Sequence, residues 1–553
     1  MNSFTTWRRK VGKRLPEPVL LGAAWLCATC TSPHQPPATR TPHTAESYVR
    51  PYTADFGYGC NMGYYGSGWD DEHLASAISK AGGQTIRVTL PDQFLDKWGW
   101  QARQAAFDHH TTNLGLRELV CFVGEPSAEH RDQTVYPGCR EPSKLFANLY
   151  EPIWLADSTI NPRNYYAAYI YRLTQTYGKH IRFWEVVNEP DFITDVSNKE
   201  WLERAPRPAE TTNTLAPIYH YIRTLRITWE VVKKYCPEDY VTPGGLGYAE
   251  YLDALLRYTD NPRGGAVTAQ FPARGGAYFD VVDYHVYPSY YLRRRNLLHT
   301  GFNYQRNSDN AAAQLLRHKA QFEAVLHQHG FNGETYPEKH FIVTETNISR
   351  RTAEWRYGSD EMQRNFGMKA LIIAQKNGIR QVHFYSIAEA ADAPKQPAGV
   401  AVDDEFKLMG MYENMNRDLP GREKLTQLGL GFKTTAELLA GWHYDAARTA
   451  ALHLPEEVDG AAFRRADQYQ YVLWAKTPID QQEEATARYT FPATWPVAGI
   501  ERRGWDFGIS GTSMRLPGRE VLLDGAPAFF TMLPLTGLQL ATVAKPYLSS
   551  PKQ

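Results

Sequence analysis

The sequence predicts an α/β fold in which a (β/α)8 barrel, the TIM barrel, is followed by a small C-terminal β-sandwich domain. Short β-rich runs alternate with amphipathic helical stretches from residue 55 to residue 442, as in a parallel sheet that helices cover. Beyond residue 442, short alternating runs split by turns indicate an all-β domain. A doubly wound sheet would also alternate, but it normally has fewer strands and often a glycine-rich first turn, and the sequence contains no G-x-G-x-x-G motif.

The 553 residues are too many for one ordinary domain. Composition and pattern divide the chain into four segments. These are a signal peptide at 1–30, a Pro-rich linker at 31–54, the barrel at 55–442 and the sandwich at 443–553.

The N-terminal segment has the features of an export signal. Basic residues between Arg8 and Arg14 precede the apolar run VLLGAAWLCATC, which extends from Val19 to Cys30. This run is shorter than the roughly 20 apolar residues of a membrane-spanning helix, and it fits the core of a secretory signal. A cysteine at the end of such a core, before a polar tether, resembles a bacterial lipoprotein signal. The resemblance implies a lipid anchor at Cys30, with Cys27 as second candidate, at the periplasm or outer membrane; simple secretion is the alternative.

Eight candidate strands account for the barrel. Each is rich in apolar, β-branched or aromatic residues, as buried strands are. In chain order they begin at Phe56, Gln84, Arg117, Ile181, Tyr240, Phe279, His340 and Ile379. Amphipathic helical patterns between them include 70–82, 164–180, 218–236 and 360–378, and the last two stop near Cys-Pro or Gly.

The last helix of the barrel is expected at 432–442, in FKTTAELLAGW. The runs that follow are RTAALHL, QYQYVLWAKT, ATARYTFPA and REVLLDGAPAFFTML. Their short alternating pattern predicts the strands of the sandwich.

Charge and composition narrow the classes of partner. Lys plus Arg and Asp plus Glu each number 60, so the formal net charge is zero. Nucleic acid is not expected as a partner, because its recognition depends on a basic surface. Aromatic residues make up 13% of the chain, and such flat rings suit the faces of sugars as well as ordinary cores.

Four cysteines follow the signal segment: Cys60, Cys121, Cys139 and Cys236. An even number in an exported protein permits disulfides. We expect a bridge between Cys121 and Cys139, which are nearest in sequence, and buried free thiols are the alternative.

Polar residues stand at the ends of the predicted strands, where such barrels carry their active sites. Asn188 and Glu189 end the fourth strand in WEVVNEP, and Glu345 ends the seventh in FIVTETN. Arg87 lies within the second strand, where a buried Arg needs a partner. The ends of the sixth and eighth strands contribute His285, Tyr287 and Tyr385.

Glu189 and Glu345 form the kind of carboxylate pair that glycoside hydrolysis requires. One carboxylic acid protonates the departing glycosidic oxygen, while the other stays ionised to attack the anomeric carbon or to activate water. A covalent route places the two carboxyl groups about 5–5.5 Å apart. The sequence predicts the pair and not the distance.

WEVVNEP and FIVTETN, with an Arg on the second strand and HVY on the sixth, resemble the retaining glycoside hydrolases of clan A. The chain looks most like family 39 and next like family 5, over residues 56–442. The resemblance implies that Glu189 is the acid/base and Glu345 the nucleophile. It further implies that Asn188 binds the sugar 2-hydroxyl.

The resemblance also assigns supporting roles around Glu345. Arg87 and Tyr287 would contact this carboxylate and keep it ionised, since a guanidinium and a phenol donor both favour the charged form. His285 would line the subsite. The eighth strand departs from the family pattern, because many relatives place a Trp there as a sugar platform and this chain has HFYSIAE. Tyr385 is expected to take that place.

Several residues have competing interpretations. Glu185 also lies on the fourth strand, but its parity and earlier position place it inside the barrel or against helices, and we interpret it as structural. Asp92 and Glu125, at other strand ends, are further candidates for contacts with sugar hydroxyls. Trp98 and Trp100 are candidates for sugar platforms or for loop packing.

No metal or cofactor is expected. The pair His109–His110 lies in a polar stretch and is interpreted as solvated. The sequence has no H-E-x-x-H motif and no paired-cysteine spacing typical of zinc.

The sequence thus predicts an exported retaining glycosidase that cleaves β-linked O-glycosidic bonds of an oligo- or polysaccharide. A non-catalytic glycan-binding lipoprotein on the same barrel is one alternative, because fold alone does not guarantee activity. A transglycosylase that uses the same residues is the other. The identity of the sugar stays open, as does the choice between exo and endo action.

Overall fold

A computed structural model describes residues 48–63, 71–193, 198–296, 301–390, 401–416, 420–495 and 497–534. The predicted signal segment, with Cys27 and Cys30, and the linker up to residue 47 lie outside the described residues.

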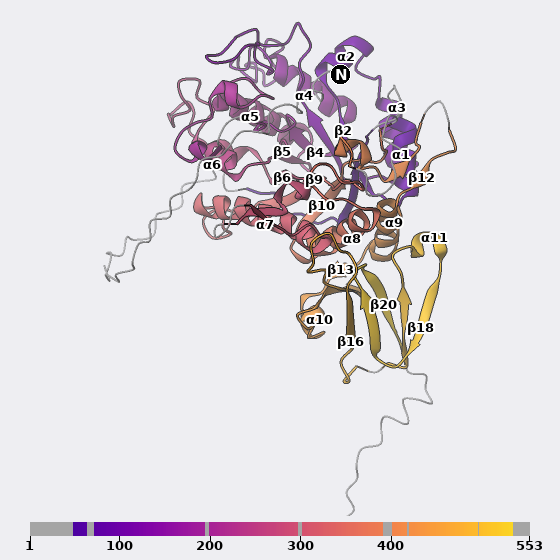
Figure 1. The fold of residues 1–553 in the computed structure, drawn as a ribbon. Helices are drawn as coiled ribbons and strands as arrows, with labels where there is room; N and C mark the ends of the chain where they lie inside the picture. Colours follow the sequence, from indigo (N-terminus) through magenta and orange to yellow (C-terminus); the bar gives the residue numbers. More distant parts are fainter. Residues whose placement is uncertain are drawn as a thin grey trace, which may run out of the picture.

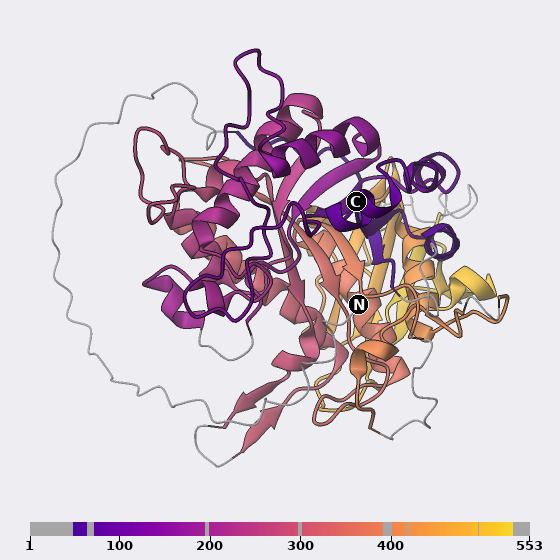
Figure 2. The same cartoon turned by 90° about the horizontal axis from the view of Figure 1, so that it is seen from above.

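Eight parallel strands form the central sheet (Figures 1 and 2), as the sequence predicts. The strands are β1 (Gly57–Asn61), β2 (Thr85–Thr89), β3 (Leu119–Val123), β4 (Ile181–Val186), β5 (Tyr240–Pro243), β6 (Val281–Val286), β9 (His340–Thr346) and β10 (Ile379–Phe384). Each pairs with the next in chain order except β5 with β6, and β10 pairs with β1. The remaining seam closes beyond β5, where the N–H of Leu246 donates to Asp283 (3.1 Å) and its carbonyl accepts from His285 (3.0 Å). The sheet is therefore a closed (β/α)8 barrel, and the predicted fold class is confirmed.

Helices surround the barrel between successive strands (Figure 2). Several begin at a side-chain cap; Asn164 caps α4 and Ser359 caps α8 by accepting from backbone N–H groups. The helices are α1 (Asp71–Lys80), α2 (Asp92–Trp98), α3 (Gln104–Thr112), α4 (Tyr165–Tyr177), α5 (Ile218–Tyr235), α6 (Ala249–Arg257), α7 (Ser308–Gln328), α8 (Asp360–Lys376) and α9 (Gln427–Leu439). Two small ribbons extend the loops: β7 (Arg293–Arg295) pairs with β8 (Phe302–Tyr304), and β11 (Tyr412–Glu413) pairs with β12 (Lys424–Leu425). No helix among the described residues is long and apolar enough to cross a membrane.

The interior of the barrel changes character along its axis. Near the N-terminal ends of the strands it is apolar, with a buried cluster of Val120, Phe183, Tyr240, Val281 and Ile342. Tyr52 packs against this cluster, with its ring 5.7 Å from that of Tyr240. Residues 48–54, which the sequence assigns to the linker, therefore include a plug under the barrel. Towards the C-terminal ends the interior is polar, and the buried residues there include Arg87, Glu185 and Asp283.

The C-terminal region is a β-sandwich attached to the side of the barrel (Figure 1). One sheet has the order β13 (His443–Tyr444), β14 (Val458–Arg465), β15 (Gln468–Ala475), β20 (Ala528–Leu533), β17 (Gly499–Arg503) and β18 (Ser513–Pro517). The other pairs β16 (Thr486–Thr490) with β19 (Glu520–Asp524). Two short helices, α10 (Ala446–Ala450) and α11 (Phe507–Ser510), complete this region.

Alternation along β15 explains why the sandwich adheres to the barrel. Val472 and Trp474 join the core of the barrel, whereas Tyr471 and Leu473 face the core between the two sheets. The indole N–H of Trp474 also donates to Asp309 of α7 (2.8 Å). The larger sheet is thus covered on both faces.

Two predictions outside the site are wrong. Cys121 and Cys139 are not bridged; the four cysteines within the described residues are free, which was the alternative interpretation. His110 is not solvated. It is fully buried on α3, three residues after Phe107 and with its ring 5.8 Å from the Phe107 ring, because both side chains lie on the inner face of this helix.

Candidate active site

Strand β4 leads into Asn188 and Glu189 through an unusual backbone turn. Val187 has a φ of 63° and Glu189 a φ of 47°, a left-handed region that non-glycine residues rarely adopt. The N–H of Glu189 donates to the carbonyl of Gly244 (2.6 Å). Nδ2 of Asn213 donates to the carbonyls of both Asn188 and Glu189, at 3.1 Å each. These contacts hold a strained conformation, which is typical of functional sites, and they aim the Glu189 side chain at the mouth of the barrel.

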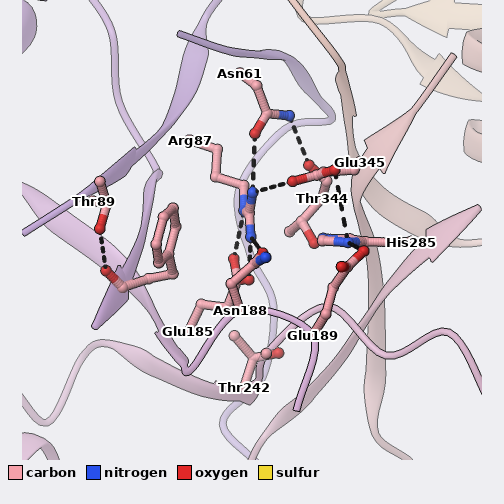
Figure 3. A network of polar contacts seen from close by, with 12 residues as sticks. Asn61, Arg87, Thr89, Glu185, Asn188, Glu189, Thr242, His285, Thr344 and Glu345 are labelled. Carbon is pink, nitrogen blue, oxygen red and sulfur yellow. Dashed lines mark hydrogen bonds and ion pairs between the residues drawn. The ribbon is translucent and has the colours of Figure 1, made fainter. Parts of the chain in front are cut away.

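Arg87 is the hub of the site (Figure 3). Its Nη1 donates to Glu345 (2.6 Å) and to Oδ1 of Asn61 (3.0 Å). Its Nη2 donates to Oδ1 of Asn188 (2.6 Å) and to Glu185 (2.5 Å), and its Nε donates to the other oxygen of Glu185 (2.8 Å). A guanidinium has five N–H donors, so all five are engaged and the group has a single orientation.

Glu345 is held by two donors and two positive charges. One carboxylate oxygen accepts from Arg87, and the other accepts from the hydroxyl of Tyr287 (2.5 Å). Burial raises the pKa of Glu345, but the charges of His285 and Arg87 and the hydrogen bonds from Tyr287 and Arg87 outweigh burial and hold this pKa below its ordinary value. Burial also raises the pKa of Tyr287 well above its usual range, with the charge of Glu345 adding to the effect, so the phenol stays a donor. Glu345 is therefore an ionised carboxylate at neutral pH.

His285 lies between the two carboxylates. Its Nδ1 is 2.8 Å from Oε1 of Glu189 and 3.8 Å from Oε2 of Glu345. Burial lowers the pKa of His285, yet the charge of Glu345 and the hydrogen bond to Glu189 raise it to about 8. The opposite edge of the ring rests against Gly245, which has a φ of 62°; a Cβ on residue 245 would lie 2.2 Å from Nε2. His285 is thus a cation at neutral pH that is wedged against the acid pair.

The two carboxyl groups are close together. One carboxylate oxygen of Glu189 and one of Glu345 lie within 4.8 Å of each other, with a ring nitrogen of His285 inside the same limit. The side chains of Glu189 and Glu345 keep 26% and 13% of their surface exposed. The pair therefore opens to solvent at the barrel mouth, and its spacing resembles that of a covalent mechanism more than the 6.5–9.5 Å of a mechanism that fits a water between the carboxyl groups.

The remaining predicted residues are also placed at this mouth. Oδ1 of Asn188 accepts from Arg87, and among the described residues its Nδ2 has no hydrogen-bond partner, so this amide group is left to donate to a ligand. Tyr385 is half-buried, and its ring centroid lies 6.3 Å from that of Tyr287. Phe406 packs edge-on against both rings, at 5.0 Å from Tyr287 and 6.0 Å from Tyr385. A three-ring aromatic wall thus stands beside Glu345.

Asn61 and Phe406 are two site residues that sequence reasoning missed. Asn61 ends β1 and bridges two strands, since it accepts from Arg87 and donates to the carbonyl of Thr344 (2.9 Å). Its position as a polar residue at a strand end is the signal that could have found it. Phe406 lies in the segment after β10, where no periodic pattern marks it.

The further candidates at strand ends do not join the site. Asp92 is fully buried and accepts from the N–H of Ser127 (2.9 Å) and from His130 (2.8 Å), so it supports the loop that follows β3. Glu125 is exposed and accepts from Gln93 (2.9 Å).

The two tryptophans of KWGW have different environments. Trp98 is 62% exposed, with Lys97 over its ring. Trp100 packs between Arg172, 3.8 Å from its ring centroid, and Tyr169. Loop packing is therefore the interpretation that holds for Trp100.

Glu189, His285 and Glu345 are also the residues that could supply three ligands to a metal ion. The guanidinium of Arg87 already occupies one oxygen of Glu345, and Tyr287 occupies the other. A divalent cation would face both Arg87 and a positively charged His285 at this point. The donor set fits proton transfer better than metal coordination.

No protein-family model and no curated protein matches this sequence. A solved structure of a family 39 glycoside hydrolase from the gut symbiont Bacteroides cellulosilyticus WH2 is similar, with a TM-score of 0.53 and 14% identity over 86% of this chain and 81% of that chain. An alpha-L-arabinofuranosidase from Thermotoga maritima has a TM-score of 0.49 and 10% identity over 87% and 96% of the two chains. A glucosidase from Croceicoccus marinus has a TM-score of 0.48 and 11% identity over the same shares.

The first of these likenesses shows a shared fold. It is a likeness to the same family that the motifs at the ends of β4 and β9 resemble. The other two scores are too low to add to the argument, and at 14% identity the comparison does not transfer an activity to this chain.

Proposed function

We propose that this protein is a retaining glycoside hydrolase that cleaves β-linked O-glycosidic bonds of an oligo- or polysaccharide through a covalent glycosyl-enzyme intermediate. The observation that carries the proposal is the approach of Glu189 and Glu345 to within 4.8 Å, with Glu345 held ionised by Arg87 and Tyr287. At this spacing a carboxylate can reach the anomeric carbon directly.

In the first step, an oxygen of Glu345 attacks the anomeric carbon and forms an ester bond to the sugar. The glycosidic C–O bond breaks, and the departing oxygen takes a proton from Glu189. The positively charged His285 beside Glu189 holds a further proton at this point of the site. In this proposal the Nδ2 donor of Asn188 bonds to the sugar hydroxyl next to the reacting carbon, and the hydrogen bond from Arg87 to Oδ1 supports that role by fixing the amide.

In the second step, Glu189 acts as the base. It takes a proton from a water molecule whose oxygen attacks the anomeric carbon and displaces Glu345. Both carboxyl groups then regain their starting protonation. Arg87 and Tyr287 stabilise the carboxylate of Glu345 as it leaves, because they donate to the oxygens on which the charge develops.

The experiment that tests this proposal is trapping with 2-deoxy-2-fluoro glycosides of the gluco, xylo and related series, followed by peptide mass mapping. We expect a label on Glu345. Glu345→Ala should lower turnover of an aryl glycoside by roughly a thousandfold or more, while Glu125→Ala, which removes an exposed carboxylate at the end of β3, should not. Near-wild-type turnover by Glu345→Ala would sink the proposal.

The same trapping and turnover measurements distinguish the two alternative functions. A labelled Glu345, with sugar transferred to added acceptor in preference to water, would identify a transglycosylase. Glycan binding without any label or turnover across the panel would identify a non-catalytic binding protein.

The export features of the N-terminal sequence support a lipoprotein anchored at Cys30, with secretion as the alternative. Cys30→Ser should abolish incorporation of radiolabelled fatty acid in a bacterial host. Unchanged labelling of that variant, with loss of label in Cys27→Ser, would move the anchor to Cys27.

A further inference from the structure

Glu185 holds Arg87 from inside the barrel, opposite the carboxylate pair. It is fully buried on β4, and both of its oxygens accept from Arg87, at 2.5 and 2.8 Å. This residue is four positions before Glu189 on the same strand. It does not face the mouth, and sequence reasoning assigned it no part in the site.

The contacts of Arg87 show what depends on Glu185. Two of the five N–H groups of Arg87 go to Glu185, and the other three go to Glu345, Asn188 and Asn61. The ring of Phe122 closes one side of the guanidinium, 4.8 Å from its centre. The two bonds to Glu185 thus select the orientation in which the remaining donors reach the catalytic carboxylate and the sugar-facing amide.

The charge of Arg87 also indicates a role for Glu185. Arg87 carries one positive charge between the carboxylates of Glu185 and Glu345. Arg87 and Glu185 are buried, whereas the side chain of Glu345 keeps 13% of its surface exposed. An unpaired buried Arg would concentrate its attraction on Glu345 and would stabilise that carboxylate more strongly. A carboxylate that is stabilised too strongly is a poorer nucleophile.

We propose that Glu185 is a positioning and charge-balancing residue for the nucleophile: it orients Arg87 toward Glu345 and Asn188, and it offsets the Arg87 charge so that Glu345 remains reactive. The catalytic part of this inference rests on the proposed function. The electrostatic part does not, because it concerns the titration of Glu345 in the protein without substrate.

The test compares Glu185→Gln with Glu185→Asp and with a matched control. The control is Asp260→Asn, which also neutralises a fully buried carboxylate paired with arginines, Arg223 at 3.2 Å and Arg226 at 3.1 Å, outside the site. Titration of Glu345 is followed by the carbon-13 NMR signal of its side-chain carboxyl in protein labelled at glutamate. The signal that disappears in Glu345→Gln is assigned to this residue. The pH profile of kcat/KM is measured on an aryl glycoside with an activated leaving group.

We expect Glu185→Gln to shift the titration of Glu345 and the acid limb of the profile to lower pH, and to lower kcat by about tenfold to a hundredfold. Glu185→Asp should keep the limb near its wild-type position, and Asp260→Asn should change thermal stability alone. A Glu345 titration that is the same in Glu185→Gln and wild type would overturn the inference. If the wild type cleaves no glycoside but the titration shifts, the proposed function fails and the electrostatic role of Glu185 stands.

Discussion

Nδ1 of His285 lies 2.8 Å from Oε1 of Glu189, and the same nitrogen is 3.8 Å from Oε2 of Glu345. An imidazolium in this place offsets the charge of the ionised Glu345 and bonds to an oxygen of Glu189. The ring comes from β6, Glu189 from the turn after β4 and Glu345 from β9. The relationship therefore exists only in the closed barrel.

The His285 contact predicts how stability depends on pH. The pKa of His285 is about 8 in the folded protein, against about 6.5 in an unfolded chain. A raised pKa contributes stability that is fully present below pH 6.5 and is lost as the pH rises through about 8. Between pH 6 and 9 this contribution should fall by about 2 kcal/mol. Urea denaturation of the wild type and of His285→Gln at both pH values checks this.

His318→Gln is the control for that experiment, because His318 is also buried but bonds only to the carbonyl of Gln314 (2.9 Å) in helix α7. Burial lowers the pKa of His318, so its own contribution to stability is lost as the pH falls, and the variant should show a fall between pH 6 and 9 at least as large as that of the wild type. If the free energy of unfolding of His285→Gln falls between pH 6 and 9 by as much as that of the wild type, His285 does not carry the charge assigned to it. The charged or titratable groups around His285 include Glu189, Glu345, Arg87 and Asp283, and none of them is altered in either variant.

Glu189→Ala should separate the two chemical steps. For substrates with poor leaving groups, loss of the acid should lower kcat/KM by about a hundredfold to ten-thousandfold. For a dinitrophenyl glycoside the first step should change little, because that leaving group needs no proton. Added azide should restore turnover by attacking the intermediate without a base, with a glycosyl azide as product. Equal loss on both substrate types would contradict the acid role.

Tyr287→Phe should raise the pKa of Glu345, because it removes a donor from the ionised carboxylate (2.5 Å). The acid limb of the kcat/KM profile should move to higher pH. A hydrogen bond to a charged group contributes about 1.5–3 kcal/mol, so kcat should fall roughly tenfold to a hundredfold. Tyr290→Phe is the matched control: its hydroxyl bonds to Glu405 (2.5 Å), which Arg356 also holds. A shift of the same size in both variants would rule out a specific role for Tyr287.

Gly245→Ala should disable the site by displacing His285. Residue 245 has a φ of 62°, and an added Cβ would lie 2.2 Å from Nε2 of His285. Gly378→Ala is the control, since residue 378 has a φ of 73° and no atom lies within 4 Å of its added Cβ. Both variants should lose about 1–2 kcal/mol from backbone strain, measured by thermal denaturation. Only Gly245→Ala should lose activity. Equal activity in the two variants would contradict a requirement for close contact between His285 and Gly245.

The places where sequence reasoning failed have a common cause. Cys121 and Cys139 are nearest in sequence, but Cys121 is buried in β3 and Cys139 lies in a loop next to the carbonyl of Leu215. Asp92 follows β2, at the first residue of α2, yet its side chain turns into the protein and accepts hydrogen bonds from Ser127 and His130. In both cases the sequence gives the position of the residue in the chain but does not show which residues lie next to it in the folded protein.

Local patterns were sufficient for the barrel and for the candidates at its mouth. Strand and helix periods depend on residues close in the chain, and parallel strands bring their C-terminal ends to one rim. Asn188, Glu189 and Glu345 could therefore be assigned to one site from their positions at strand ends. Three features came only with the closed fold. They are the distance between the two carboxyl groups, the left-handed turn that orients Glu189, and the hydrogen bonds of Arg87 to both Glu185 and Glu345. These features depend on the register of strands far apart in the sequence and on electrostatic interactions summed over groups from several of them, and neither has a local signature in the chain.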